Sequence, residues 1–176
     1  MKKYEFTGET KRVELWNRTA TLHRIKATVE FGFVKVGELG GWIEKEENLS
    51  HEGKAWVWGN AKVCGDAKVC GDAEVCGDAK VWGNAKVCGD AKVCGDAEVF
   101  LASHVLVMGS VGSRNDFTTF FRDKDNEITV KCGCFLGKID KFLEKVTQTH
   151  GNNKYALVYR AAVEVAKLQI ELTERK

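Results

Sequence analysis

Residues 55–102 read AWVWGN AKVCGD AKVCGD AEVCGD AKVWGN AKVCGD AKVCGD AEVFLA, a run of eight consecutive hexads. Every hexad begins with Ala and has Val third, and the first seven end in Gly-Asn or Gly-Asp. In an extended segment, residues two apart point to the same side, so Ala and Val form one apolar face. Gly-Asn and Gly-Asp favour tight turns because they tolerate a positive φ. Each hexad therefore predicts a short strand followed by a corner.

A single hexad cannot bury its Ala-Val face, but stacked coils bury these faces in one continuous core. Counted from Val, the repeat is V-C-G-D-A-K, which resembles the hexapeptide motif of left-handed parallel β-helices. In that family three hexads form one triangular coil, so the resemblance implies about 18 residues per coil and a left-handed winding. Two degenerate hexads, SHVLVM and GSVGSR, extend the run to ten, and we expect just over three coils.

This coil period predicts columns of stacked side chains, because residues three hexads apart should lie about 4.8 Å apart. The position after Val gives three columns: Cys64, Trp82 and Phe100; Cys70, Cys88 and Leu106; and Trp58, Cys76 and Cys94. The position before Val gives three more: Lys62, Lys80 and Glu98; Lys68, Lys86 and His104; and Trp56, Glu74 and Lys92.

The Cys/Trp/Phe position should face outward, although it is apolar. Either the flanking segments cover these side chains, or they form a partner-binding or self-association surface. A metal site along the cysteine columns is disfavoured, because structural zinc needs four convergent ligands. The chain has seven cysteines, and five occupy one position of the repeat, unlike the irregular spacing of a secreted disulfide framework. We therefore expect free thiols in a reducing compartment.

The composition limits the function classes. The net charge of +2 favours neither a strongly basic nucleic-acid-binding protein nor a uniformly acidic DNA mimic. No apolar run approaches the roughly 20 residues of a membrane span, and the N-terminus has no apolar signal core. We therefore expect a cytoplasmic protein with no membrane partner.

The flanks of the repeat differ from it in character. We expect residues 1–48 to form an N-terminal β cap, with β segments at 3–6, 19–28 and 31–36. The β-helix domain is then residues 49–112, and residues 113–176 form a C-terminal α+β domain. In that domain, strands at 117–121 and 128–132 and helices near 138–149 and 154–171 predict a ββαα unit.

No motif for catalysis or cofactor binding stands out. The chain lacks a phosphate-binding glycine loop, and no Ser-His-Asp order or carboxylate pair is evident. His104 could serve as a general base, but no partner residue for it can be named. Cys132-Gly133-Cys134 is a single C-x-C that would need a further ligand such as His150. We therefore predict no catalytic residue, no cofactor and no metal.

The hexads resemble those of acyltransferases built on the left-handed β-helix. Those enzymes are usually trimers whose active sites use a histidine and a loop that protrudes from the coils. Residues 55–102 are uninterrupted, so the protruding loop is missing. An acyl-CoA-dependent transferase therefore stays the alternative function, with His104 near its site.

A closer resemblance covers nearly the whole chain. Residues 37–63 (GELGGWIEKEENLSHEGKAWVWGNAKV), the hexads, and residues 128–155 (ITVKCGCFLGKIDKFLEKVTQTHGNNKY) are similar to small phage and prophage proteins of gut bacteria. Some β-helical phage proteins of this kind are anti-CRISPR inhibitors. The resemblance implies a non-catalytic inhibitor in the host bacterial cytoplasm that binds a host protein or protein–nucleic-acid complex such as a CRISPR effector nuclease.

The rigid coils would present this binding surface. The residues expected to contact the partner are aromatic anchors and charged side chains of the repeat: Trp56, Trp58, Glu74, Trp82, Lys92, Glu98 and Phe100. A nucleotide-signal sponge and a self-assembling structural protein are further alternatives, and homo-oligomerisation stays open.

Overall fold

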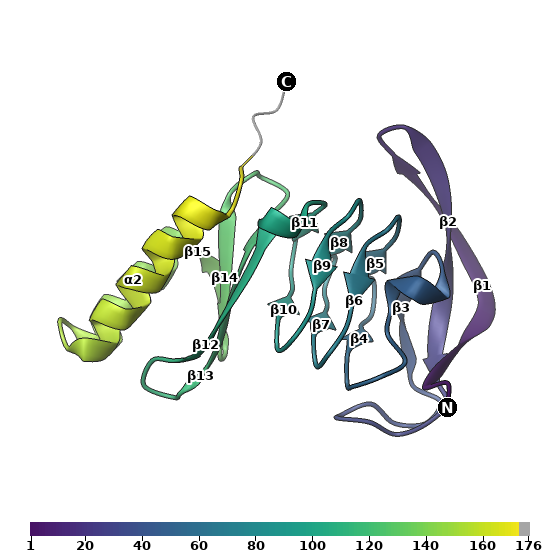
Figure 1. The fold of residues 1–176 in the computed structure, drawn as a ribbon, viewed down its shortest axis with the longest axis horizontal. Helices are drawn as coiled ribbons and strands as arrows, with labels where there is room; N and C mark the ends of the chain where they lie inside the picture. The colour runs from purple at the N-terminus through teal and green to yellow at the C-terminus, as the bar shows by residue number, and fades with distance from the viewer. Residues whose placement is uncertain (173–176) are drawn as a thin grey trace.

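The computed structural model describes residues 1–172 and is mainly β, with 41% strand and 20% helix. Figure 1 shows three parts along the long axis: a long hairpin, a stack of coils, and a sheet carrying two helices. The hairpin strands are β1 (Tyr4–Leu15) and β2 (Arg18–Ala27), followed by β3 (Leu39–Ile43) and a short 3-10 turn (Glu46–Asn48).

The hexads form a parallel β-solenoid of about three turns. Each hexad contributes a two-residue strand: β4 (Trp56–Val57), β5 (Lys62–Val63), β6 (Lys68–Val69), β7 (Glu74–Val75), β8 (Lys80–Val81), β9 (Lys86–Val87), β10 (Lys92–Val93) and β11 (Glu98–Val99). The three faces are β4-β7-β10, β6-β9 and the part of a larger sheet formed by β3-β5-β8-β11. The predicted period is confirmed, since strands three hexads apart pair in parallel. The left-handed sense stays a prediction.

The repeated Ala and Val side chains form the solenoid core. All eight hexad Val residues and all eight hexad Ala residues are buried. Burying a Val side chain contributes roughly 1.5–3 kcal/mol relative to leaving it exposed. The corners require glycine: Gly77 has a φ of 70°, and a Cβ there would lie 2.8 Å from the backbone nitrogen of Gly95.

The solenoid begins before the first hexad. Strand β3 pairs in parallel with β5, where Trp42 lies beside Lys62, and Leu49 bridges to Val69. The segment expected to be only a cap therefore also supplies part of the first coil. Another expectation is wrong: residues 31–36 form a turn with one isolated bridge, Phe31 to Val34, rather than a strand. The first strand is also much longer than the predicted residues 3–6.

The two degenerate hexads do not continue the coils. After a short 3-10 turn (Ala102–His104), β12 (Val105–Val111) pairs antiparallel with β13 (Asp116–Arg122). Leu106 and His104 therefore do not stack on Cys88 and Lys86 as predicted. These hexads lack the Ala-x-Val face and the Gly-Asp corner, so nothing in them favours another coil.

The C-terminal part is a four-stranded antiparallel sheet covered by two helices. The sheet order is β12-β13-β14-β15, with β14 at Ile128–Cys132 and β15 at Phe135–Lys138. The predicted β13–β14 hairpin and both helices, α1 (Ile139–His150) and α2 (Lys154–Gln169), are confirmed. Strands β12 and β15 were missed by the ββαα prediction. The expected domain range of 113–176 extends to residues 173–176, which lie outside the described residues.

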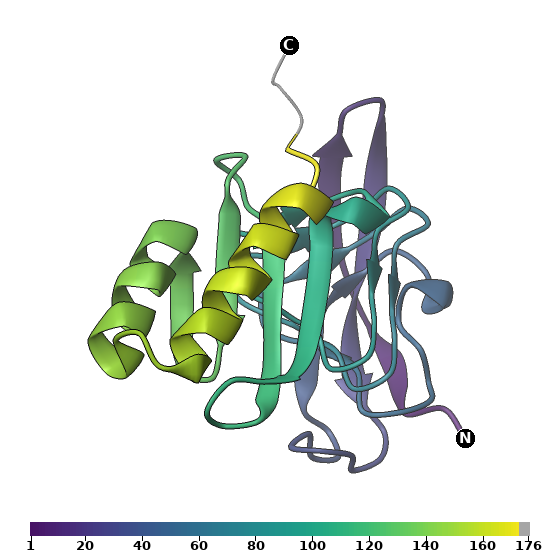
Figure 2. The same ribbon diagram turned by 60° about the vertical axis from the view of Figure 1, so that its left-hand side comes forward.

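Both ends of the solenoid core are closed. Tyr4, Ile25 and Val34 join the core cluster from the N-terminal part, and Phe121 joins it from β13. Its neighbour Phe120 points into the other cluster, between the sheet and the helices. Figure 2 shows both helices on the face of this sheet that is turned away from the coils. The C-terminal sheet is thus sandwiched between the coils and the helices.

The expectation that the repeat cysteines are free thiols is wrong in the structure. Disulfides join Cys70 to Cys88 and Cys76 to Cys94, each across a sequence separation of 18. The Cα–Cα distances are 4.7 and 4.6 Å, which is within the range of disulfides. Coil stacking alone therefore brings such pairs within bonding distance. Cys64 stays free because Trp82 occupies the next coil of its column.

Candidate binding groove

A groove of about 360 Å³ lies over the face formed by β4, β7 and β10. At one end it is bounded by the turn containing Phe33 and Val34. At the other end it is bounded by Phe117 and Thr119 of β13 and by Lys131 of β14. Three separate parts of the chain therefore build one concave surface along the solenoid.

Columns of charged side chains form the floor of the groove. On the strands, Glu74 lies between Trp56 and Lys92, and the Lys92 Nζ is 3.5 Å from a Glu74 carboxylate oxygen. At the neighbouring corner, Lys54 Nζ is 3.6 Å from an oxygen of Asp72. Exposed pairs of this kind add little stability, typically below about 1 kcal/mol. Their main effect is to present both signs of charge at fixed positions.

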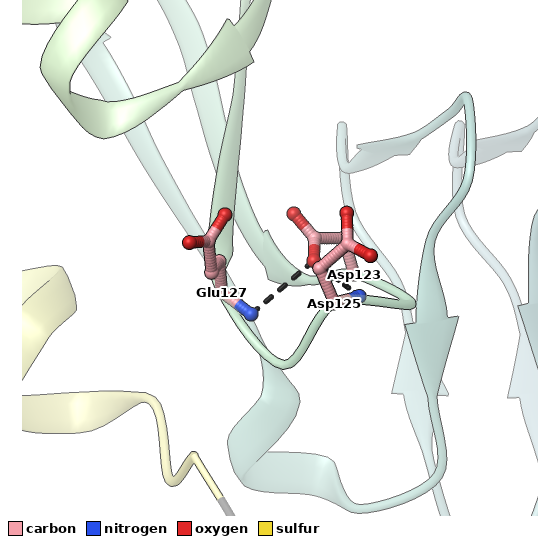
Figure 3. Close-up of side chains that lie close together, drawn as sticks. All are labelled: Asp123, Asp125 and Glu127. Carbon is pink, nitrogen blue, oxygen red and sulfur yellow. Dashed lines mark hydrogen bonds between the residues drawn. The ribbon is translucent and has the colours of Figure 1, made fainter.

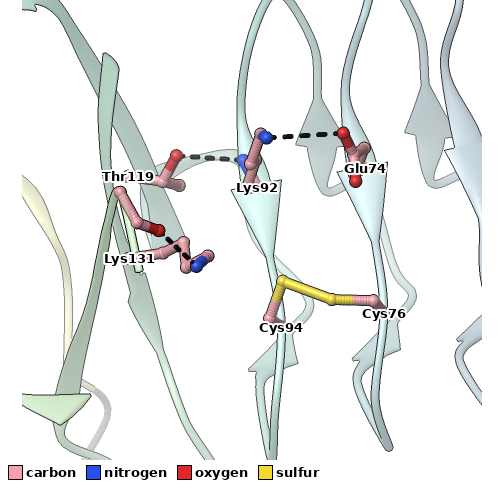
Figure 4. The surroundings of a disulfide bond; sticks show 7 residues. Glu74, Cys76, Lys92, Cys94, Thr119 and Lys131 are labelled. Atoms are coloured by element: carbon pink, nitrogen blue, oxygen red, sulfur yellow. Dashed lines mark hydrogen bonds and ion pairs between the residues drawn. A yellow bond between two sulfur atoms is a disulfide. The ribbon is translucent and has the colours of Figure 1, made fainter. Parts of the chain in front are cut away.

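The C-terminal sheet completes the groove through Thr119. In the solenoid, a backbone N–H normally donates to the next coil; for example, the N–H of Glu74 donates to the carbonyl of Ala91. For β10 the acceptor comes from outside the coils: the N–H of Lys92 donates to Thr119 Oγ1 over 2.9 Å (Figure 4). This bond satisfies an edge donor of the last coil on this face and fixes the groove wall against its floor.

Aromatic side chains lie at both ends of the groove. Phe33 is 88% exposed at the N-terminal end, and Phe117 is 39% exposed at the C-terminal end. Trp58 is half-buried beside the fully buried Trp56, with ring centroids 6.5 Å apart in an edge arrangement. Such large exposed rings are the side chains that most often anchor protein interfaces.

The structure divides the seven predicted contact residues into two sets. Trp58, Glu74 and Lys92 line the groove with accessible side chains, whereas Trp56 lies beneath it and is fully buried, so the prediction that Trp56 contacts a partner is wrong. Trp82, Glu98 and Phe100 lie instead on or next to β8 and β11, in the sheet that also contains the hairpin strands. Only the first set forms a common concave surface.

The second set holds the parts of the molecule together. Trp82 packs against the hairpin cluster that contains Leu22, and its ring stacks on Phe100 with centroids 5.0 Å apart. The Arg122 guanidinium carbon lies 4.9 Å from the centroid of Phe100. Glu98 pairs with Lys80 over 3.4 Å. For this column, the expectation that flanking segments cover the outward apolar position is confirmed.

Several groove residues had no signal in the sequence. Phe33, Phe117, Thr119 and Lys131 come from segments far from the hexads, and only folding brings them beside β4, β7 and β10. Asp72 is the last residue of a hexad, but the repeat alone does not place it in a groove. No spacing rule could have joined these segments, because their contacts depend on how the caps dock.

His104 packs in the interior of the protein. Its side chain is fully buried, and its Nδ1 accepts a 3.3 Å hydrogen bond from the backbone N–H of Phe100. Burial, aided by the nearby Arg122 cation, lowers the pKa of His104 to about 4, so the ring is neutral at pH 7. His104 lines neither the groove nor the smaller pocket described below.

An acidic cluster lies at the turn between β13 and β14. Asp123, Asp125 and Glu127 have donor atoms within 4.8 Å of one another (Figure 3), and residues 1–172 contain no other group of three potential metal ligands that is this close. The Lys138 ammonium is 2.6, 3.3 and 2.7 Å from oxygens of these three carboxylates. The cluster is therefore already neutralised in part by a cation of the chain itself.

The central carboxylate of this cluster is a structural group. Burial opposes ionisation of Asp123, but hydrogen bonds from Lys138, Thr129 and two backbone N–H groups outweigh it and lower its pKa. The turn also docks on the last coil, where the N–H of Lys124 donates to the carbonyl of Asp96. Asp123 thus stabilises the junction between the two parts.

The C-x-C sequence lies at a second, smaller pocket of about 140 Å³. Cys132, Cys134 and His150 all line it, so the structure does bring the predicted partner histidine near the two thiols. Their donor atoms are not close enough together to form a metal site, since the acidic cluster is the one such group within residues 1–172. His150 Nε2 instead lies 3.4 Å from Ser113 Oγ.

Comparisons with known proteins add no family. No protein-family model matches the chain, and no curated protein is significantly similar to it in sequence. Within residues 1–172, neither helix has the length and apolar character needed to cross a bilayer. The fold and the groove therefore define the molecule only as a β-solenoid protein with a preformed surface groove.

Proposed function

We propose that this protein is a non-catalytic binding protein whose groove over β4, β7 and β10 holds an extended segment of a partner protein. The observation that carries the proposal is the groove itself, with Phe33 and Phe117 at its ends and paired charges on its floor. Aromatic anchors around a polar centre are typical of protein interfaces.

The dimensions of the groove favour an extended segment. It follows the stacking direction of the coils, which are spaced about 4.8 Å apart. A strand-like segment lying along this direction would place an apolar side chain near each aromatic end. Between them, Glu74 and Lys92 would face side chains of both charges or neutral polar groups.

Rigidity supports binding by the folded surface. The groove floor is cross-linked by the disulfide between Cys76 and Cys94, and its wall is fixed by Thr119 (Figure 4). A surface that is already ordered loses less conformational entropy when a partner binds. The uninterrupted hexads and the buried His104 also support a binding role over acyl transfer.

The partner class comes from the resemblance to small phage proteins. On that basis the proposed partner is a host antiphage defence complex such as a CRISPR effector nuclease, which the protein inhibits by binding. A protein–nucleic-acid complex of this kind offers both basic and apolar segments that suit a groove of mixed charge.

The test uses the full chain and a panel of purified defence nucleases with their guide RNAs. We expect one complex to be retained by the wild-type protein, and its nuclease activity to fall on binding. Changing Phe33→Ser together with Phe117→Ser should weaken binding by about 1,000-fold, because each anchor contributes roughly 2 kcal/mol, or about 30-fold. Trp16→Ser is the matched control, since Trp16 is 98% exposed at the hairpin tip outside the groove.

Two results would count against the proposal. Retention that is unchanged in the Phe33→Ser/Phe117→Ser variant would exclude the groove as the contact surface. Failure of the wild-type protein to bind any complex in the panel, together with unchanged phage plaquing on hosts that express it, would exclude the defence-inhibitor role.

A further inference from the structure

Helix α2 is apolar on two opposite faces. One face packs on the C-terminal sheet and is buried: Ala156, Tyr159, Ala162, Val163 and Ala166. A second set of apolar residues points to solvent: Leu157, Val158, Ala161, Val165 and Leu168. At about 100° per residue, this second set falls within one arc of roughly 100° on the side away from the sheet.

The exposed set is unusually accessible for residues of its kind. Leu168 is 89% exposed, Leu157 59%, Val165 45% and Val158 37%. Isolated exposed apolar residues are normal, but a continuous stripe of them usually marks an interface. In the described part of the chain, no other helix carries such a stripe.

The spacing along the stripe is that of a helix-pairing seam. Val158, Ala161, Val165 and Leu168 follow one another at intervals of three, four and three residues. This alternation is the a/d pattern by which two helices pack knobs into holes. The natural occupant of the stripe is therefore another helix.

We infer that α2 pairs with α2 of a second copy of this chain, antiparallel and about a two-fold axis. Under this reversal, Leu168 of one copy packs beside Val158 of the other, and Val165 packs beside Ala161. Each large side chain then meets a smaller one. In a parallel pair, two Ala161 residues would share one layer and leave a hole.

The charged residues beside the seam already have partners within the chain. Arg160 donates to Asn152, Thr147 and Gly151, and Glu164 lies 3.0 Å from Lys167. The choice of orientation therefore depends on side-chain size. The helix dipoles of an antiparallel pair are also favourably opposed. The interface is isologous, as in most dimers.

The expected dimer is modest in affinity. A single helix pair of this length buries less than the roughly 800 Å² per partner of a standard stable interface. We therefore expect a dissociation constant in roughly the micromolar range. This inference is independent of the groove, because α2 lies on the far side of the C-terminal sheet from the coils (Figure 1).

The first test is analytical ultracentrifugation of the full-length wild-type chain from micromolar to several hundred micromolar concentration. We expect a reversible monomer–dimer equilibrium that Leu168→Glu shifts to monomer by at least tenfold in dissociation constant. The matched control is Val36→Glu, which places the same charge on an apolar residue that is 62% exposed in the segment before β3. Circular dichroism checks that each variant stays folded.

The outcomes separate the inference from its competitors. A wild-type chain that stays monomeric throughout overturns it. A dimer that survives Leu168→Glu, or one that is lost in Val36→Glu, places self-association on another surface and also overturns it.

A second test examines orientation by cross-linking in a Cys132→Ser/Cys134→Ser background, which removes the two non-buried free thiols. A mixture of the Val158→Cys and Leu168→Cys variants should oxidise to a mixed disulfide dimer, because reversal sets these positions side by side. Dimers formed by the Val158→Cys variant alone would indicate a parallel pair and contradict the antiparallel arrangement.

Discussion

The disulfide between Cys76 and Cys94 offers a quantitative test of coil stacking. Replacing both residues, as Cys76→Ala/Cys94→Ala, removes a cross-link across a sequence separation of 18. In the chain-entropy model, closing a loop of that length stabilises the folded state by about 3 kcal/mol, because the cross-link restricts the unfolded chain. For a chain of this size, 3 kcal/mol corresponds to a fall in Tm of roughly 6–12 °C.

Thermal unfolding followed by circular dichroism measures this change, with and without a thiol reductant. Reduction of the wild-type protein should lower its Tm more than the double substitution does, because reduction opens both disulfides. Cys134→Ala is the matched control: Cys134 is exposed and unpaired, so its replacement should change stability by less than about 0.5 kcal/mol.

Peptide mapping under non-reducing conditions identifies the linked residues directly. We expect Cys70 linked to Cys88 and Cys76 linked to Cys94, with Cys64 recovered as a thiol. The reasoning would be refuted if all of the repeat cysteines were recovered as thiols after aerobic oxidation and the Tm did not respond to reductant. In that case, stacking in register would not by itself lead to cross-linking.

Three further predictions concern the fold. Phe121→Ala should destabilise the protein by about 3–5 kcal/mol in urea unfolding, because this fully buried ring closes the end of the solenoid core. An effect below about 1 kcal/mol would show that the C-terminal sheet is not needed to close that core. Asp123→Asn should cost about 2 kcal/mol at pH 7. Folding lowers the pKa of Asp123, so the stability that its carboxylate contributes is full above the unfolded pKa of 3.8 and is lost as the pH falls through the folded pKa. The difference in Tm between the variant and the wild type should therefore shrink on acidification. A difference that stays constant down to low pH would contradict the assignment. Duplicating residues 61–78 adds one whole coil and should preserve cooperative unfolding. Duplicating only residues 61–66 should lower the Tm sharply, because it rotates the C-terminal sheet by a third of a coil. Equal Tm values for the two insertions would refute the three-hexad period.

The solenoid was predictable because its information is local and repeated. Ala and Val two residues apart define the inward face, and Gly-Asp or Gly-Asn defines each corner. The same rule explains where the prediction was wrong at the C-terminal end. Residues 103–114 keep the length of two hexads but lack both features, and there the chain turns into an antiparallel hairpin instead.

The candidate groove was only half predictable. Trp56, Glu74 and Lys92 form one column, and the coil period alone predicts that they stack. Phe33 and Phe117 gave no comparable signal, because neither belongs to the repeat and their positions depend on how the two flanking parts dock. Sequence reasoning therefore found the floor of the groove and missed its two ends.

The sequence by itself determined the period, the buried face and the corners, since these follow from backbone geometry repeated every six residues. Only the tertiary structure decided which outward columns are covered, which cysteines meet, and which apolar faces stay exposed. Trp82 and Phe100 became half-buried packing residues beside the hairpin, while Leu168 stayed in solvent. The physical reason is that side-chain exposure depends on contacts between segments far apart in the chain, and no local pattern encodes those contacts.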